Sequence, residues 1–187
     1  MINIFNRDKV NKGDLIKIKI LKFYIANGNS TIIDLSKDLN LSVPTTTKII
    51  NEMCDDGYVK EFGKLETCEG RHPNLYGVNP DSGYFVGVDI NHTSLNIGVM
   101  NFQGDLVDLR MKDAYQFENT PKSLDDLCNH VSSFIDDLDV DKEKIFNVNF
   151  NISGRVNPDT GYSYSVFNFS ETPLNKVLSD KIGFNVN

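Results

Sequence analysis

Cysteine, long apolar runs and net positive charge are all scarce in this 187-residue sequence. The three cysteines, Cys54, Cys68 and Cys128, are too few and too scattered for a disulfide framework, and they lack the C-x-x-C spacing of a zinc site. Apolar runs are short, as at residues 84–88, so no segment is predicted to span a bilayer. The first residues also lack the apolar stretch of a signal peptide. We therefore expect a cytoplasmic protein without membrane contact.

Acidic residues outnumber basic ones by 26 to 19, but the excess is confined to one part of the chain. Residues 1–79 hold 11 Lys+Arg and 10 Asp+Glu, whereas residues 80–187 hold 8 and 16. A turn-forming Asn-Pro-Asp-Ser-Gly string at 79–83 separates the two parts. We expect two modules, 1–80 and 84–187, with different partners. Only the first has a charge balance that is compatible with nucleic acid.

The first module has the pattern of a winged helix-turn-helix. Apolar residues recur at helical spacing over 14–26, and a second helix is expected after an N-cap at Ser30. A third helix is expected from an N-cap at Ser42 to about residue 55, with Pro44 in its first turn. Strands are predicted over 58–62 and again around 75–78. Two short helices joined by a tight turn and followed by a wing predict a DNA-binding module.

The third helix divides into a core side and an outward side. At 100° per residue, Thr46, Ile49, Ile50 and Met53 fall together on the predicted core side. The outward residues and the cap are short donors or a base, suited to phosphates and base edges. The candidates for DNA contact are Ser42, Thr45, Thr47, Lys48 and Asn51. The alternative is an ordinary amphipathic helix with a polar exterior.

The predicted wing supplies further candidates. Gly70 permits unusual backbone geometry, and Arg71 and His72 would project from the hairpin tip toward the minor groove or the DNA backbone. Basic residues near the N-terminus would add salt-dependent phosphate contacts; these are Arg7, Lys9, Lys12, Lys17, Lys19 and Lys22. A plain surface hairpin, and a helix with a solvated lysine face, are the alternatives.

Two stretches together resemble the DNA-binding module of ROK-family transcriptional repressors. They are Leu41-Ser42…Thr45…Lys48-Ile49-Ile50-Asn51-Glu52-Met53…Gly57-Tyr58-Val59 and Gly70-Arg71-His72-Pro73-Asn74-Leu75-Tyr76. The second stretch is the more selective of the two. In that family the winged helix precedes a sugar-kinase-like domain.

The second module continues the resemblance. Strands are predicted near 84–90, 94–100 and 106–111, then a helix from Pro121 to Leu138, a strand over 145–152 and a helix over 173–182. This order is that of the first part of a ribonuclease-H-like, actin-type ATPase domain. The expected fold class is therefore mixed α+β and α/β, with a winged helix-turn-helix followed by an incomplete domain of that type.

Two loops of this module correspond to ligand-binding loops of the family. The family's phosphate loop, Asp-x-Gly-x-Thr, is matched at Asp89 and Thr93, but Asn91 replaces the glycine and His92 lies beside it. We interpret the loop as vestigial, although its residues could equally be ordinary turn residues. The resemblance also implies a sugar-binding loop, for which the candidates are Ser153, Gly154, Arg155 and Asn157. A tight turn that exposes polar side chains is the alternative there.

The main hypothesis is a sequence-specific DNA-binding regulator, most simply a repressor. Its expected partners are a double-stranded DNA operator, a sugar or sugar phosphate effector, and a second copy in a homodimer or higher homo-oligomer. The family's catalytic Asn-Asp pair and zinc cluster have no match before Asn187. We therefore expect a fragment with no catalytic residue and no cofactor. An ATP-dependent sugar kinase with an accessory DNA-binding domain is the first alternative, and a protein-binding winged module is the second.

Overall fold

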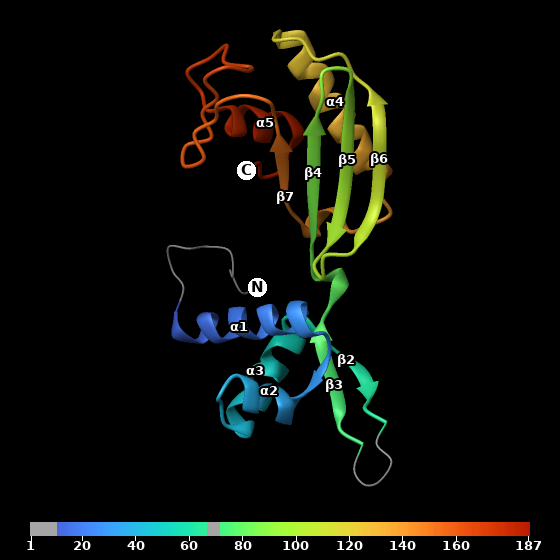
Figure 1. Ribbon diagram of the computed structural model, residues 1–187, viewed down its shortest axis with the longest axis vertical. Helices are drawn as coiled ribbons and strands as arrows, with labels where there is room; N and C mark the ends of the chain where they lie inside the picture. Colours follow the sequence, from blue (N-terminus) through green and yellow to red (C-terminus); the bar gives the residue numbers. More distant parts are fainter. Residues whose placement is uncertain (1–10, 67–71) are drawn as a thin grey trace. The chain divides into compact units, whose positions relative to one another are not determined.

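The computed structural model describes residues 11–66 and 72–187, which fall into two compact units, Met1–Ser82 and Gly83–Asn187 (Figure 1). Gly70 and Arg71 of the predicted wing, together with Arg7, Lys9 and Cys68, lie outside the described residues. In the described ranges, no helix combines the length and the apolarity needed to cross a membrane.

The described residues of the first unit, 11–66 and 72–82, form three helices and a small antiparallel sheet. The elements in chain order are α1 (Lys12–Asn27), β1 (Ser30–Thr31), α2 (Ile32–Asp38), α3 (Val43–Asp55), β2 (Val59–Lys64), β3 (Asn74–Val78) and a 3-10 turn at Pro80–Ser82. The strand order is β1-β3-β2, and β2 with β3 forms the wing hairpin. The winged helix-turn-helix predicted from the sequence is thus confirmed.

Each helix of this unit begins at a capping side chain. Asn11 and Asp14 form a reciprocal capping box at α1, and the Ser42 hydroxyl accepts the Thr45 amide at α3. The predicted cap at Ser30 is wrong by one residue, because Thr31 accepts the Asp34 amide instead. Ser30 pairs with Tyr76 of β3, and this strand contact delays the start of α2.

Buried side chains from all three helices and from the wing strands form the hydrophobic core of the first unit. The predicted core side of α3 is confirmed, since Thr46, Ile49, Ile50 and Met53 are all buried. They pack with other buried apolar side chains, namely Ile20, Leu21, Tyr24, Leu35, Tyr58, Val59 and Val78. Full burial of one such side chain contributes roughly 1.5–3 kcal/mol, so this core fixes the position of α3.

The second unit is a four-stranded sheet with two helices. Its elements are β4 (Tyr84–Ile90), β5 (Ser94–Asn101), β6 (Leu106–Ala114), α4 (Pro121–Asp137), a 3-10 turn at Lys142–Lys144, β7 (Ile145–Asn151) and α5 (Leu174–Ile182). The sheet order is β6-β5-β4-β7, antiparallel except that β7 runs parallel to β4. All six predicted elements are present, and Thr120 caps α4.

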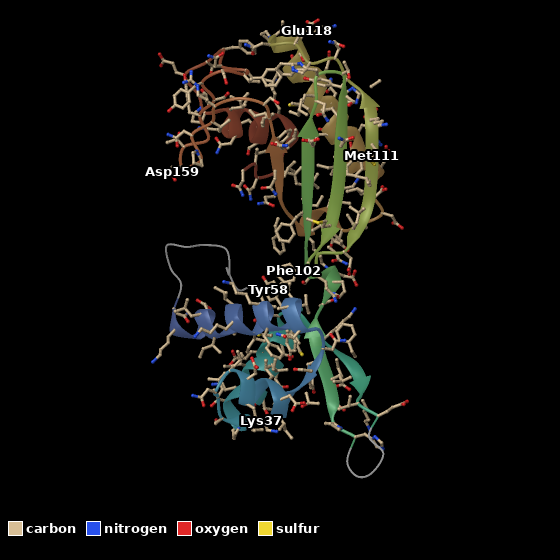
Figure 2. The ribbon with its side chains drawn as sticks, in the orientation of Figure 1. Lys37, Tyr58, Phe102, Met111, Glu118 and Asp159 are labelled. Carbon is tan, nitrogen blue, oxygen red and sulfur yellow. The ribbon has the colours of Figure 1, made fainter. Side chains whose placement is uncertain are left out.

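One face of this sheet is buried under α4, which crosses behind β4, β5 and β6 in Figure 1. Val86, Val88, Leu95 and Ile97 on the strands meet the apolar side of α4 in a single core. The edge strand β6 stays largely exposed, and Met111 on it keeps 61% of its surface in solvent (Figure 2).

Candidate nucleic-acid interface

The predicted DNA-contacting residues lie at the N-cap of α3 and on its outward side as far as Asn51. Ser42, Thr45, Lys48 and Asn51 are exposed and Thr47 is half-buried. The Lys48 side chain has 79% of its surface accessible, and its ammonium lies 4.0 Å from Glu52. An exposed pair at that distance is weak, so the Lys48 charge stays available to a phosphate.

The hydroxyl groups on this face are mostly engaged within the helix. The Thr47 hydroxyl donates to the Val43 carbonyl at 2.9 Å. The Ser42 and Thr45 hydroxyl oxygens lie 2.7 Å apart, so one of them donates its proton to the other. Each hydroxyl has a single proton, so only one of the three remains for an outside acceptor.

The basic residues of α1 have two distinct roles. Lys12, Lys19 and Lys22 are exposed. Lys17 was expected among the phosphate-binding residues, but its side chain is only 12% exposed and its ammonium lies 3.1 Å from Glu52. A second carboxylate, that of Asp56, is 3.6 Å away. Because two carboxylates of the α3 region hold it, Lys17 joins α1 to α3 and its charge is not free for DNA.

Among the predicted wing residues, His72 lies within the described part of the hairpin. His72 is exposed, and its Nδ1 lies 3.2 Å from the Leu65 carbonyl on the facing arm. The Leu65 amide in turn donates to the Pro73 carbonyl at 2.9 Å. His72 therefore lies where the two arms of the hairpin still contact each other.

In the second unit, the loop predicted to be a vestigial phosphate loop is the turn between β4 and β5. The Asp89 carboxylate accepts three amide hydrogen bonds, from Asn151 at 2.7 Å and from Asn96 and Asn91 at 3.2 Å each. The Asn151 bond is the main cause that lowers the pKa of Asp89, followed by the Asn96 bond. Asn96 and Asn151 were not among the predicted site residues. The β4–β7 register that places Asn151 opposite Asp89 is a long-range pairing.

The residues present do not fit a magnesium–nucleotide site of the kind that the family's motif implies. A carboxylate offers about four lone-pair positions, and three of those of Asp89 are occupied by side-chain amides. Asn91 has no positive φ, so the turn forms without the left-handed geometry that a glycine would allow. No three His, Cys, Asp or Glu side chains of the described ranges form a group able to hold a metal ion.

The predicted sugar-binding loop is a self-contained turn after β7. The Asn157 side-chain oxygen accepts the Asp159 and Thr160 amides, at 2.9 and 3.2 Å, which leaves only its amide group for a ligand. A Cβ at Gly154 would lie 2.5 Å from the Ser165 hydroxyl, so the close neighbour of this glycine is the chain itself. Arg155 is exposed, and its backbone amide donates to Ser165.

The structure brings the two loops of the second unit together at one small cavity. Asn91 and His92 line it from one side and Ser153 from the other, with apolar walls from Ile90, Phe117, Ile152 and Val166. Its volume is about 60 Å³, far below the roughly 300 Å³ at which ordinary ligand pockets begin. The described loops therefore meet, but the cavity between them is smaller than a sugar.

Comparison with known protein families agrees with the winged helix-turn-helix fold of the first unit. A family model described as winged helix-turn-helix DNA-binding matches residues 14–60. This range runs from α1 into β2 and includes every predicted DNA-contacting residue of α3.

Similarity to curated proteins extends into the second unit. The chain is 23% identical over 172 residues to a xylose repressor of Caldicellulosiruptor bescii. The aligned region covers 91% of this chain and 43% of that repressor. It is 25% identical over 103 residues to the xylose repressor of Staphylococcus xylosus, covering 54% of this chain and 26% of that protein. The chain thus spans less than half the length of these curated relatives.

Among solved structures, a ROK-family transcriptional regulator, described as a homologue of the E. coli MLC protein, shares the fold. The TM-score is 0.62 at 19% identity, covering 89% of this chain and 43% of the other. The resemblance is therefore confirmed at the level of the fold: a winged helix-turn-helix followed by a mixed α+β domain, as in that ROK-family regulator.

Proposed function

We propose that this chain is the DNA-binding part of a transcriptional repressor that is controlled by a sugar or a sugar phosphate. The observation that carries the proposal is the geometry of α3: its core side is fully buried, while Lys48, Asn51 and the capped N-terminus face outward beside a wing hairpin. Winged helix-turn-helix proteins place such a helix in the major groove. Such a regulator would act in the bacterial cytoplasm, on a double-stranded operator.

The proposed phosphate contacts come from Lys48 on α3 and from Lys19 and Lys22 on α1, and the proposed base or backbone contact comes from Asn51. Arg71 and His72 of the wing are proposed to reach the DNA backbone or the minor groove. Helix-turn-helix readers commonly bind two half-sites as symmetric dimers, and we include a homodimer or higher homo-oligomer in the proposal. Direct titration of a two-half-site duplex, with the bound mass measured, would give two chains per duplex.

Duplex binding across ionic strength tests the DNA-binding role. The measurement is fluorescence anisotropy of a labelled duplex between 50 and 200 mM salt. Each neutralised phosphate contributes about −0.9 to the slope of the logarithm of the binding constant against the logarithm of salt concentration. Several lysine–phosphate contacts therefore predict that affinity falls steeply as salt rises. A folded chain that binds no duplex, or whose binding ignores salt, would contradict the role.

The sugar control is supported by the kinase-like fold of the second unit and by the curated relatives, which are named as xylose repressors. A sugar bound near Arg155 and Asn157 would shift the population between DNA-competent and DNA-incompetent arrangements. Xylose is the first compound to test, as a competitor of duplex binding by the full-length protein. Arg155→Ala should remove the response and leave sugar-free DNA affinity unchanged. Lys122→Gln, on exposed α4 surface, is the matched control.

We further propose that the chain performs no phosphoryl transfer and carries no cofactor. In support, the Asp89 carboxylate is engaged by three amides and the motif's glycine is Asn91. Incubation of the full-length protein with ATP and a panel of hexoses and pentoses should yield no sugar phosphate. Formation of any sugar phosphate would revive the kinase alternative.

A further inference from the structure

The carboxylate of Glu52 on α3 lies between two lysines. Glu52 follows Lys48 by four residues on the helix and keeps 45% of its side chain in solvent. Its Oε2 lies 3.1 Å from the ammonium of Lys17 on α1, and its Oε1 lies 4.0 Å from the ammonium of Lys48. Only the first distance is within the range of a hydrogen bond. Glu52 is therefore held by Lys17 rather than by Lys48.

The surroundings of the two lysines explain this preference. The Lys17 side chain is only 12% exposed, and its ammonium also lies 3.6 Å from Asp56, the C-cap residue of α3. Salt screens a partly buried ion pair less than an exposed one, and a positive charge near the C-terminal end of a helix is favoured by the helix dipole. Lys48 is exposed and precedes Glu52, which is the less favourable order for an ion pair four residues apart on a helix.

Lys17 and Lys48 together balance the charges of Glu52 and Asp56. Without Lys17, Glu52 would keep Lys48 as its one cation within 4.0 Å among the described residues. The carboxylate would then compete with a DNA phosphate for the Lys48 ammonium, and its negative charge would oppose the phosphate directly.

We infer that Lys17 is a positioning residue for DNA binding: by holding Glu52, it leaves the Lys48 ammonium free for a DNA phosphate. The inference rests on the proposed DNA-binding function. It gives Lys17 an indirect role in DNA affinity, even though the Lys17 charge itself is held by Glu52 and Asp56.

Lys17→Met tests this role, because methionine keeps much of the apolar length of the side chain and removes the ammonium. Duplex binding by the full chain is measured by fluorescence anisotropy at low and high salt. Glu52 should then engage Lys48, and the salt slope should fall by about one unit, as for the loss of one phosphate contact. The ratio of dissociation constants across a fourfold change in salt should therefore fall about 3.5-fold. Lys181→Met is the matched control, because it removes a lysine paired with Asp125 in the sheet unit, and it should leave the slope unaltered.

A double variant separates this role from the structural role of Lys17 in joining α1 to α3. Lys17→Met combined with Glu52→Gln removes the carboxylate that would compete for Lys48, so the wild-type salt slope should return. The thermal unfolding midpoint, measured without DNA, should not recover, because the ion pairs of Lys17 are still absent. A purely structural role would leave the slope reduced in the double variant. Comparison of the double variant with the wild type gives the same test if Lys17→Met alone does not fold.

The outcomes distinguish this inference from the proposed function. A folded Lys17→Met variant that keeps the wild-type slope would overturn the role of Lys17 and leave the DNA-binding function intact. A slope that stays reduced in the folded double variant would also overturn it. Absence of any duplex binding by the wild-type chain would overturn both.

Discussion

The Lys48 ammonium on α3 is open to solvent and 4.0 Å from its nearest carboxylate, whereas the Asp89 carboxylate at the end of β4 accepts three amide hydrogen bonds. Residues 1–79 are nearly neutral, and residues 80–187 carry the acidic excess of the chain. Charged groups thus remain available in the winged unit and are internally satisfied in the phosphate-type loop of the sheet unit. The comparison teaches that a sequence motif must be judged by the groups that its side chains already bind within the fold.

The largest expected effect is a loss of stability in the winged unit, with the stability of the sheet unit unchanged. Met53→Ala removes a fully buried side chain of α3 and should lower the free energy of unfolding of the winged unit by roughly 2–5 kcal/mol. Amide hydrogen exchange, read residue by residue, should show lost protection in 11–66 and 72–82 only. Leu15→Ala, at an exposed position, is the control. Equal loss of protection in both units would contradict their independence.

The next prediction sharpens the charge comparison. Lys48→Gln removes one proposed phosphate contact and should reduce the salt slope of duplex binding by about one unit. The ratio of dissociation constants between 200 and 50 mM salt would then fall about 3.5-fold. Lys122→Gln makes the same charge change in the sheet unit, on α4, and should leave the slope unaltered. Matching effects of the two variants would indicate a non-specific charge effect.

A third prediction separates the capping role of Ser42 from its proposed DNA contact. Ser42→Ala removes the cap of α3 and should cost about 1 kcal/mol of stability. Ser42→Asp keeps a capping oxygen, so the thermal unfolding midpoint should hold, but the added negative charge should weaken duplex binding. Duplex affinity that is unchanged in Ser42→Asp would place the helix N-terminus away from DNA.

The smallest effect concerns the pH response of Asp89 in the β4–β5 turn. The pKa of Asp89 is lowered in the folded state, mainly by the Asn151 amide. The contacts of its carboxylate therefore stabilise the fold above the unfolded pKa, and this stabilisation is lost as the pH falls through the folded pKa. Asn151→Ala should raise the Asp89 pKa toward its ordinary value, as measured by carboxyl NMR titration. Asn149→Ala is the control, since its amide contacts Asn147; an equal shift there would contradict the assignment.

Local signals explain which features were predictable from the sequence. The helices follow apolar spacing and caps such as Ser42 and Thr120, and their bounds agree within about two residues. The two-residue strand β1 was missed because it depends on pairing with β3, more than forty residues away. The engagement of Asp89 by Asn96 and Asn151, and of Lys17 by Glu52, likewise depends on tertiary contacts that no local pattern encodes.

The same distinction applies to the candidate interface. The outward positions of α3 could be predicted because 100° per residue fixes its faces, whereas the state of its hydroxyl protons could not. Whether Thr47 donates outward or to Val43 depends on a side-chain rotamer that the sequence leaves open.

Chemical-shift mapping on the full chain tests the contrast between the units most directly. An isotope-labelled sample is titrated at low salt with a duplex that the chain has selected from a randomised pool. The amide chemical shifts are followed for both units. The account predicts shifts over Ser42 to Asn51 and along β2 and β3, with the β4–β7 sheet unchanged. Shifts concentrated on the sheet, or an α3 that does not respond to bound DNA, would contradict it.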